Sequence, residues 1–136
     1  MYHLHHIGCA VENLEKAMQY YIKIFGYKFD KDYIDIEQNI KAKLLKNNNH
    51  YIELIAKIDV NQQSPIDKIL NERGGGTYHH CYLTNDLANT LKKLKKEGFI
   101  EFTKKNIETN DFMARFVITP DNYLLEFLQL KERKDR

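Results

Sequence analysis

Hydrophobic and polar residues recur along this chain with the two periods that secondary structure imposes. Residues 4–11 and 77–84 alternate between apolar and polar positions in the manner of half-buried strands. Each alternating segment is followed by a stretch with helical spacing, at 13–25 and, more weakly, at 86–97. We therefore expect two strand–helix units whose helices pack on a sheet. The apolar faces consist of Leu14, Ala17, Met18, Tyr21 and Phe25 in the first helix and of Leu87, Leu91 and Leu94 in the second.

Three further strands are predicted after each helix, which makes eight strands in all. Asparagines at 47–49 and the segment 120–122 provide turns between the last two strands of each half. Asn13 and Asn85 stand where the helices need N-caps, and a glycine follows each helix. The additional strands are expected at 27–34, 40–46 and 50–56 in the first half and at 100–104, 115–119 and 123–129 in the second.

The segment between the halves predicts a third, shorter helix. Ser64 is a suitable N-cap, Pro65 suits the first helical position, and Asp67 is an acid three residues after the cap. The glycine run at 74–76 marks the end of this helix.

The two halves also resemble each other residue by residue. A His-His pair opens each half, a glycine follows each helix, and a segment with a central glutamate closes each half. The second histidines are 74 residues apart, the glycines 72 and the glutamates 73. Three landmarks at nearly one spacing indicate an internal duplication. They are His5-His6 and His79-His80, Gly26 and Gly98, and Glu53 and Glu126.

The duplication predicts an α+β fold in which two βαβββ repeats form curved mixed sheets around a shared site. A chain of 136 residues fits one domain, so we expect a single domain over 1–136. The expected boundaries are about 3–56 for the first repeat, about 57–76 for the linker helix, about 77–130 for the second repeat and 131–136 for a solvated tail.

Charge and composition narrow the classes of function. The 21 basic and 19 acidic residues are interspersed and leave a formal net charge of +2, which argues against a nucleic-acid partner. The chain has no run of 18 apolar residues and no export signal, so we expect no membrane partner and a cytoplasmic location. Cys9 and Cys81 are expected to be reduced rather than joined in a disulfide.

Strand alternation singles out four polar side chains as candidate metal ligands. Glu53 and Glu126 each stand between apolar neighbours on one face of a strand, where a carboxylate needs its charge compensated. Only one histidine of each His-His pair can share that face, and matching positions in the two halves select His6 and His80, with His79 facing away. A single strand histidine is more often a hydrogen-bonded structural residue, but its recurrence in both repeats favours ligation.

Two imidazoles and two carboxylates would give one divalent ion four protein ligands. Octahedral coordination would then leave positions for water or for two substrate oxygens. This donor set suits Zn, Ni, Co, Mn or Fe, and the sequence does not choose among these metals.

These residues resemble the vicinal oxygen chelate superfamily, which includes glyoxalase I, extradiol dioxygenases, bleomycin-binding proteins and methylmalonyl-CoA epimerase. The resemblance covers residues 3–130. The segment 64–76, with the His79-His80 pair and the helix that follows, is most similar to methylmalonyl-CoA epimerases and epimerase-like glyoxalase homologues. Residues 37–40, Glu-Gln-Asn-Ile, also resemble the Glu-Gln-Gly-Val of epimerases.

The resemblance implies a metal-dependent isomerase or lyase that chelates neighbouring substrate oxygens and stabilises an enolate. It implies His6, Glu53, His80 and Glu126 as metal ligands, with Glu126 the first candidate for the catalytic base. It further implies a small-molecule substrate of the acyl-CoA or thiohemiacetal type and a homodimer. An epimerase of the methylmalonyl-CoA type is the leading interpretation.

Two departures from the epimerase pattern keep other functions open. Many epimerases have glutamine where this chain has Glu53, and Ala42 stands where some hold their second base. Glu53, Glu37, a tyrosine or a water would then have to carry the second proton. The alternatives are a glyoxalase I (lactoylglutathione lyase)-like enzyme, a binding protein of the bleomycin-resistance type that dimerises around an apolar ligand, and an enzyme acting on a sugar or secondary-metabolite precursor.

Overall fold

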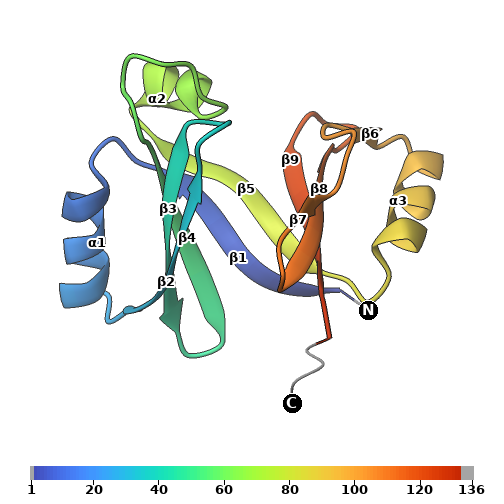
Figure 1. Ribbon diagram of the computed structural model, residues 1–136, viewed down its shortest axis with the longest axis horizontal. Coiled ribbons are helices and arrows are strands. Elements are labelled where there is room, and N and C mark those ends of the chain that lie inside the picture. The colour runs from blue at the N-terminus through green and yellow to red at the C-terminus, as the bar shows by residue number, and fades with distance from the viewer. Residues whose placement is uncertain (1, 133–136) are drawn as a thin grey trace. The chain divides into compact units, whose positions relative to one another are not determined.

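Two compact units make up the protein, as seen in a computed structural model that describes residues 2–132 (Figure 1). Residues 6–78 form the N-terminal unit, and residues 2–5 together with 79–132 form the C-terminal unit. The division between the units passes through strands β1 and β5. Of the predicted solvated tail, residues 133–136 lie outside the described residues.

The N-terminal unit has the βαβββ order expected for the first repeat. Its strands are hydrogen-bonded in the order β2-β3-β4-β1, with β1 and β4 parallel and the other neighbours antiparallel. The linker helix α2 follows the last strand. The elements are β1 (His3–Ala10), α1 (Leu14–Lys23), β2 (Lys28–Asp35), β3 (Ile40–Asn47), β4 (His50–Lys57) and α2 (Asp67–Arg73).

The C-terminal unit repeats this topology. Its strand order is β5-β9-β8-β6, with β5 and β9 parallel, and β7 also pairs with β8. The elements are β5 (Gly76–Leu83), α3 (Leu87–Lys96), β6 (Ile100–Glu101), β7 (Ile107–Glu108), β8 (Phe112–Ile118) and β9 (Leu124–Leu130). The α+β class with mixed strand pairing in two βαβββ repeats is thereby confirmed.

One strand of the second repeat differs from the prediction. The position that β2 holds in the first repeat is divided between β6 and β7, which have two residues each, so nine strands are assigned among residues 2–132 where eight were expected. Between β6 and β7 the strand pairing with β8 is interrupted, because the Arg115 side chain on β8 binds side chains and a backbone carbonyl of residues 101–106 instead. The Arg115 guanidinium donates to Glu101, to the carbonyl of Thr103 and to Asn106.

Each long helix packs on its own sheet through most of the predicted apolar face, except that Phe25 lies beyond the end of α1 and is 52% exposed. Leu14 and Ala17 of α1 join the buried side chains of β3 and β4, among them Leu45 and Leu54. In the second repeat, Leu87 of α3 packs with Val117 and Phe127. Burial of these side chains on one face of each sheet leaves the opposite face to carry the polar groups of the site.

The helix ends confirm one predicted cap and correct another. The Asn13 side chain accepts a hydrogen bond from the Lys16 backbone N–H at 3.0 Å, so Asn13 caps α1 as expected. Asp86, not Asn85, caps α3, because its carboxylate accepts from the Asn89 N–H at 3.0 Å. A carboxylate and an amide serve equally at this position, so composition alone could not choose between adjacent residues.

The linker helix begins slightly later than predicted. Its first helical residue is Asp67, and Gly74 ends it in the left-handed conformation with φ of 73°. Ser64 and Asp67 nevertheless bond each other in the manner of a capping box, since the Asp67 carboxylate accepts from the Ser64 N–H at 2.9 Å. Lys57 of β4 forms an ion pair with the same carboxylate at 2.7 Å and joins the helix to the sheet.

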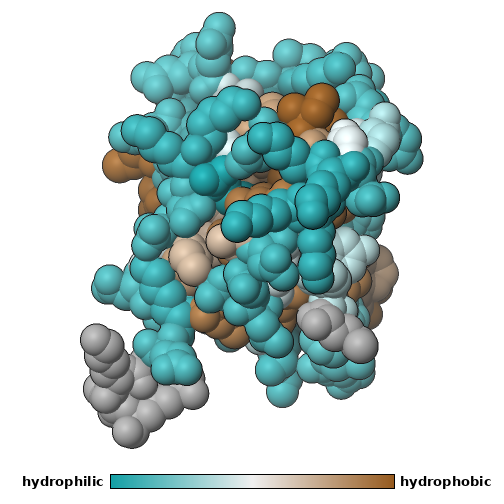
Figure 2. Space-filling model, turned by 90° about the vertical axis from the view of Figure 1, so that its right-hand side faces the viewer, coloured by the Kyte–Doolittle hydropathy of each residue, from teal (hydrophilic) through white to brown (hydrophobic). Residues whose placement is uncertain are grey.

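The solvent side of α3 is strongly basic. Lysines at 92, 93, 95 and 96 are all exposed, whereas Leu87 and Thr90 are buried. Figure 2 views the molecule from the side on which α3 lies in Figure 1, and this face is largely hydrophilic. Among the helices in residues 2–132, none has the length and apolar character needed to cross a membrane.

Candidate functional site

A histidine and a glutamate come together on the sheet of the N-terminal unit. Strand β1 pairs in parallel with β4 so that Gly8 lies opposite Glu53, and His6, two residues earlier, shares that face. The Nε2 atom of His6 lies 3.6 Å from the Oε1 atom of Glu53. Only 6% of the His6 side chain and 19% of the Glu53 side chain are exposed.

The C-terminal unit contains an equivalent pair. Strand β5 pairs in parallel with β9 so that Cys81 lies opposite Glu126, which places His79 on the face of Glu126. The Nε2 atom of His79 lies 3.1 Å from the Oε1 atom of Glu126. Both side chains are buried, and the His79 ring meets the Phe116 ring edge-on with centroids 5.2 Å apart.

The two His–Glu pairs are related by the internal duplication. His6 and His79 are 73 residues apart, and so are Glu53 and Glu126. Gly8 and Cys81, which face the two glutamates, have the same separation. We call the His6–Glu53 and His79–Glu126 pairs the two half-sites.

The structure places a different histidine beside Glu126 from the one that the sequence predicted. The histidine beside Glu126 is His79, whereas His80 lies on the other face of β5 with its ring centroid 5.2 Å from that of Tyr123. Matching the His-His pairs by their second histidines shifted the alignment by one residue, and in a strand such a shift exchanges the faces. The 73-residue spacing of Glu53 and Glu126 was the signal in the sequence that selects His79.

Each half-site has the geometry of two ligands of one metal ion. Imidazole and carboxylate ligands lie about 2.0–2.2 Å from zinc-like metals, so two of them in tetrahedral or octahedral coordination stand roughly 3 to 3.6 Å apart. The observed separations of 3.6 and 3.1 Å fall in this range. Glu126 is only 8% exposed, and a buried carboxylate is stabilised by an adjacent cation. The donors present therefore fit a divalent metal.

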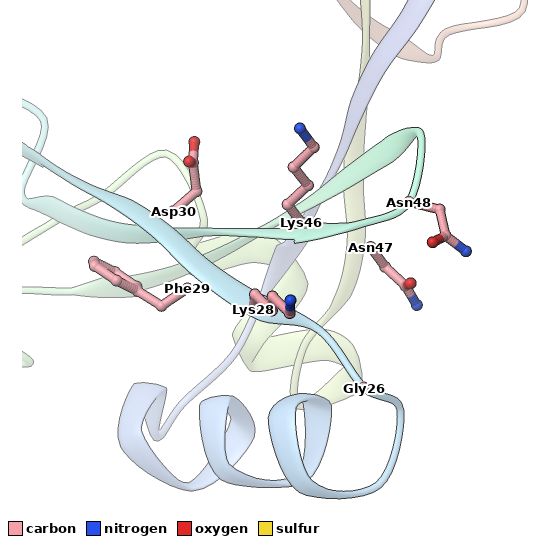
Figure 3. A pocket seen from close by; sticks show the side chains of 7 residues that line it. All are labelled: Gly26, Lys28, Phe29, Asp30, Lys46, Asn47 and Asn48. Carbon is pink, nitrogen blue, oxygen red and sulfur yellow. The ribbon is translucent and has the colours of Figure 1, made fainter.

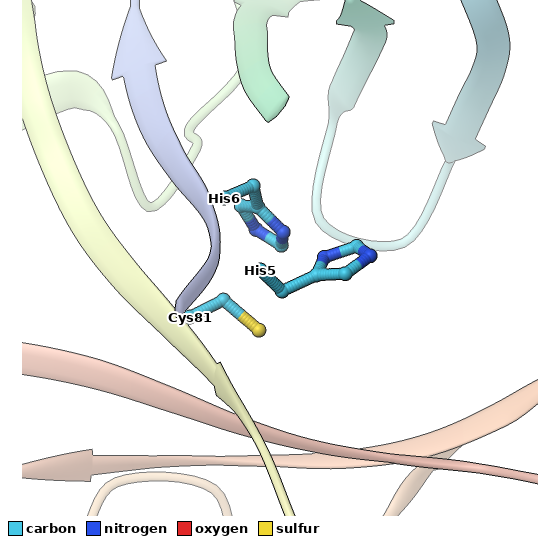
Figure 4. A group of neighbouring side chains, drawn as sticks. All are labelled: His5, His6 and Cys81. Carbon is cyan, nitrogen blue, oxygen red and sulfur yellow. The ribbon is translucent and has the colours of Figure 1, made fainter. Parts of the chain in front are cut away.

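A histidine and a thiol also approach each other in the C-terminal unit. A ring nitrogen of His5 lies within 4.8 Å of the Cys81 sulfur (Figure 4). Cys81 is buried on the face of β5 that carries His79. A cysteine here, where the first repeat has Gly8, places a soft donor beside the His79–Glu126 half-site.

The opposite face of the first sheet holds groups that stay protonated at neutral pH. Cys9 packs there with the core under α1, and burial raises the pKa of its thiol. Burial also raises the pKa of the Tyr21 hydroxyl to about 12. Neither group is suited to act as a nucleophile or base near pH 7. Cys9 and Cys81 are not joined in a disulfide, as expected.

The residues considered as second proton carriers are distributed over the first repeat. Ala42 faces the side of Glu53, and Tyr33 lies directly opposite Ala42 on β2. Glu37 is exposed in the turn before β3. Tyr33 and Tyr51 are therefore both placed by the strand register on the face of Glu53.

Comparison with known proteins identifies the family. A family model described as the Glyoxalase/Bleomycin resistance protein/Dioxygenase superfamily matches residues 5–116. The chain belongs to this superfamily. Its fold is shared by a hypothetical protein from Bacillus halodurans C-125, with a TM-score of 0.86 at 22% identity over 99% of both chains. A methylmalonyl-CoA epimerase from Mycobacterium tuberculosis has a TM-score of 0.82 at 24% identity, covering 95% of this chain and 88% of that one.

Two curated relatives in the superfamily are named as enzymes. The mitochondrial methylmalonyl-CoA epimerase of Dictyostelium discoideum is 27% identical over 96 residues, which is 70% of this chain and 57% of the relative. The lactoylglutathione lyase of Schizosaccharomyces pombe is 24% identical over 99% of this chain and 50% of the relative. The chain thus spans little more than half the length of these relatives. The structural likenesses, at under 25% identity, show the fold alone.

Proposed function

We propose that this protein is a metal-dependent isomerase that converts an acyl-CoA substrate through an enolate, as a methylmalonyl-CoA epimerase does. The observation that carries the proposal is the pair of equivalent half-sites, His6–Glu53 and His79–Glu126, on a fold of the glyoxalase superfamily. The epimerase name of the Dictyostelium relative supports the choice of substrate class. The resemblance to the superfamily supports a homodimer as the assembled form.

The proposed metal ligands are His6, Glu53, His79 and Glu126, with His79 in place of His80. Assigning both half-sites to one divalent ion rests on the duplication and on the superfamily resemblance. When bound, the ion supplies Lewis-acid stabilisation of the negative charge that develops on the substrate oxygens. Zn, Ni, Co, Mn and Fe all accept this combination of imidazole and carboxylate ligands.

Glu126 is the proposed base that removes the proton from the substrate carbon. Its carboxylate is largely withdrawn from water, and His79 fixes the position of one oxygen. Glu53, with 19% of its side chain exposed, is the proposed second carboxyl group, which would donate its own proton to the enolate carbon while Glu126 keeps the proton that it removed. Epimerisation requires two proton carriers, and each repeat supplies one carboxyl group.

Exchange of the substrate proton with D₂O tests this assignment. Glu126→Gln should retain the fold and most of the metal while losing exchange by a factor on the order of 10² to 10⁴, the usual contribution of a general base. Glu108→Gln, which changes an exposed glutamate of the same unit, is the matched control. Exchange at the wild-type rate in Glu126→Gln protein with full metal content would exclude Glu126 as the base.

A lactoylglutathione lyase-like reaction is the second candidate. It is favoured by Glu53, because glutamate at this position resembles glyoxalase I more than most epimerases, and by the Schizosaccharomyces relative. The stereochemical outcome separates the two. An epimerase converts one methylmalonyl-CoA epimer into a mixture, whereas the lyase-like enzyme leaves it unchanged and turns over the thiohemiacetal of glutathione with methylglyoxal.

A further inference from the structure

We infer that Lys28 and Lys46 bind the phosphate groups of a long substrate, at the far end of the sheet face that carries His6 and Glu53. The inference rests on the proposed function for the reacting end of that substrate. It adds a site for the other end, within the N-terminal unit. Three observations carry it: the strand register, the opposition of two like charges, and a pocket.

The strand register places four side chains in one row. His6 on β1 lies opposite Tyr51 on β4, Tyr51 lies opposite Lys46 on β3, and Lys46 lies opposite Lys28 on β2. Opposite residues share a face, and Glu53, two residues after Tyr51, shares it too. The row therefore begins at the first half-site and ends at two lysines. The Nζ atom of Lys46 lies 5.6 Å from the centre of the Tyr51 ring, within reach of a cation–π contact.

The two lysines at the end of the row lie directly opposite each other, so their positive charges repel. Like charges directly opposite each other on an antiparallel pair are destabilising. Other lysines of the chain have acidic partners, such as Lys43 with Asp32 and Lys57 with Asp67. Among the ion pairs within residues 2–132, none includes Lys28 or Lys46. An anion bound between the two ammonium groups would remove this repulsion.

A pocket of about 460 Å³ lies at the same place (Figure 3). Lys28 and Lys46 line it together with Phe29, Asp30 and neighbouring asparagines, and its volume is in the range of small-molecule sites. In Figure 3 the Lys46 and Asp30 side chains project to the same side of the hairpin. The lining thus carries two ammonium groups and one carboxylate, which leaves an excess of positive charge that favours an anion.

The distance along the row indicates the kind of anion. Neighbouring strands are about 4.7–4.9 Å apart, so three strand spacings separate the backbone at His6 from that at Lys28 by roughly 14 Å. A compact diacid bound at the half-site would not reach the lysines. An acyl-CoA would, because its thioester and its phosphates stand at opposite ends of a long flexible arm. The pocket is therefore assigned to CoA phosphates.

Titration with CoA itself tests the inference, since CoA has phosphates but no acyl group to react. Lys28→Gln/Lys46→Gln protein should bind CoA at least about 10-fold more weakly than wild type, the effect of losing two charge-assisted contacts. Asp30→Asn should bind CoA more tightly, because it removes the opposing carboxylate. The matched control is Lys92→Gln/Lys93→Gln, which removes two exposed lysines of α3.

Pyrophosphate and glutathione distinguish the sources of the anion. Pyrophosphate that competes with CoA in wild type, but not in the Lys28/Lys46 variant, supports a phosphate site. Equal loss of CoA binding in the α3 control, or wild-type affinity in the Lys28/Lys46 variant, overturns the inference. The inference is also overturned if CoA does not bind and glutathione binds in a way that depends on Lys28 and Lys46. Failure of the proposed function would appear separately, as absent proton exchange with CoA binding intact.

Discussion

At the residue scale, the site depends on which group stabilises the negative charge of the buried Glu126 carboxylate. Glu126 is 8% exposed and lies opposite Cys81 and Phe116, two side chains that cannot neutralise a charge. The Nε2 atom of His79 lies 3.1 Å from the Glu126 Oε1 atom. A protonated imidazole or a shared metal ion would each stabilise this carboxylate. His80, on the opposite face, contributes to neither arrangement.

The adjacent histidines therefore provide a matched test of metal ligation. His79→Asn should weaken metal binding by roughly 10- to 100-fold or more, since even outer partners of metal ligands have effects of this size. His80→Asn should change the metal affinity little. Competition with a chromogenic chelator measures both, and the circular dichroism of each variant controls for folding. Greater loss from the change at His80 would restore the ligand set predicted from the sequence.

At the scale of elements, the start of α3 connects the second repeat to its own sheet. The Asp86 carboxylate accepts from the Asn89 N–H at 3.0 Å, and the Gln129 side chain on β9 accepts from the Leu87 N–H at 2.7 Å. Two of the N–H groups that a helix leaves open are thus satisfied, one locally and one across the fold. Gln129 is three residues from Glu126, so the bond also fixes the strand that carries the proposed base.

Removing the Asp86 side chain, which caps α3, should destabilise the protein, whereas removing the neighbouring Asn85 side chain should not. Asp86→Ala should lower the free energy of unfolding by about 0.5–2 kcal/mol, the usual effect of removing an N-cap acceptor. Asn85→Ala, one residue earlier, should have an effect within about 0.5 kcal/mol, as expected for a surface substitution. Urea unfolding of both variants measures the difference. Equal destabilisation would mean that both side chains support the helix start.

At the scale of the whole molecule, the proposed metal would couple its binding to folding. A ligand that binds only the folded chain adds about 2.7 kcal/mol of stability at 100 times its dissociation constant. The donors at His6, Glu53, His79 and Glu126 come from both repeats, so such an ion would stabilise the two repeats together.

Chelation should therefore lower the thermal midpoint, and readdition of metal should restore it. Elemental analysis of protein purified without chelator should find one ion per chain. His6→Asn and His79→Asn should each abolish the metal-dependent shift in the midpoint, while His80→Asn retains it. Two ions per chain would show that each half-site binds its own metal, and a midpoint insensitive to chelation would contradict metal coupling altogether.

The sequence by itself determined the features that depend on local periodicity and on repetition. The apolar spacing of α1 and α3 identified both helices and their buried faces, and alternation identified β1, β4, β5 and β9 to within a few residues. The duplication predicted the βαβββ topology of both units and singled out His6, Glu53 and Glu126. These features follow from short-range rules, because a helix or strand repeats its faces within a few residues.

Only the tertiary structure decided the features that depend on strand register. Whether His79 or His80 faces Glu126 is set by the pairing of β5 with β9, and because side chains alternate with a period of two, a shift of one residue exchanges the two histidines. The opposition of Lys28 and Lys46 likewise follows from the pairing of β2 with β3. Register arises from hydrogen bonds between segments that local sequence patterns describe separately. The proximity of His79 to Glu126 and the lysine pocket were therefore visible only in the fold.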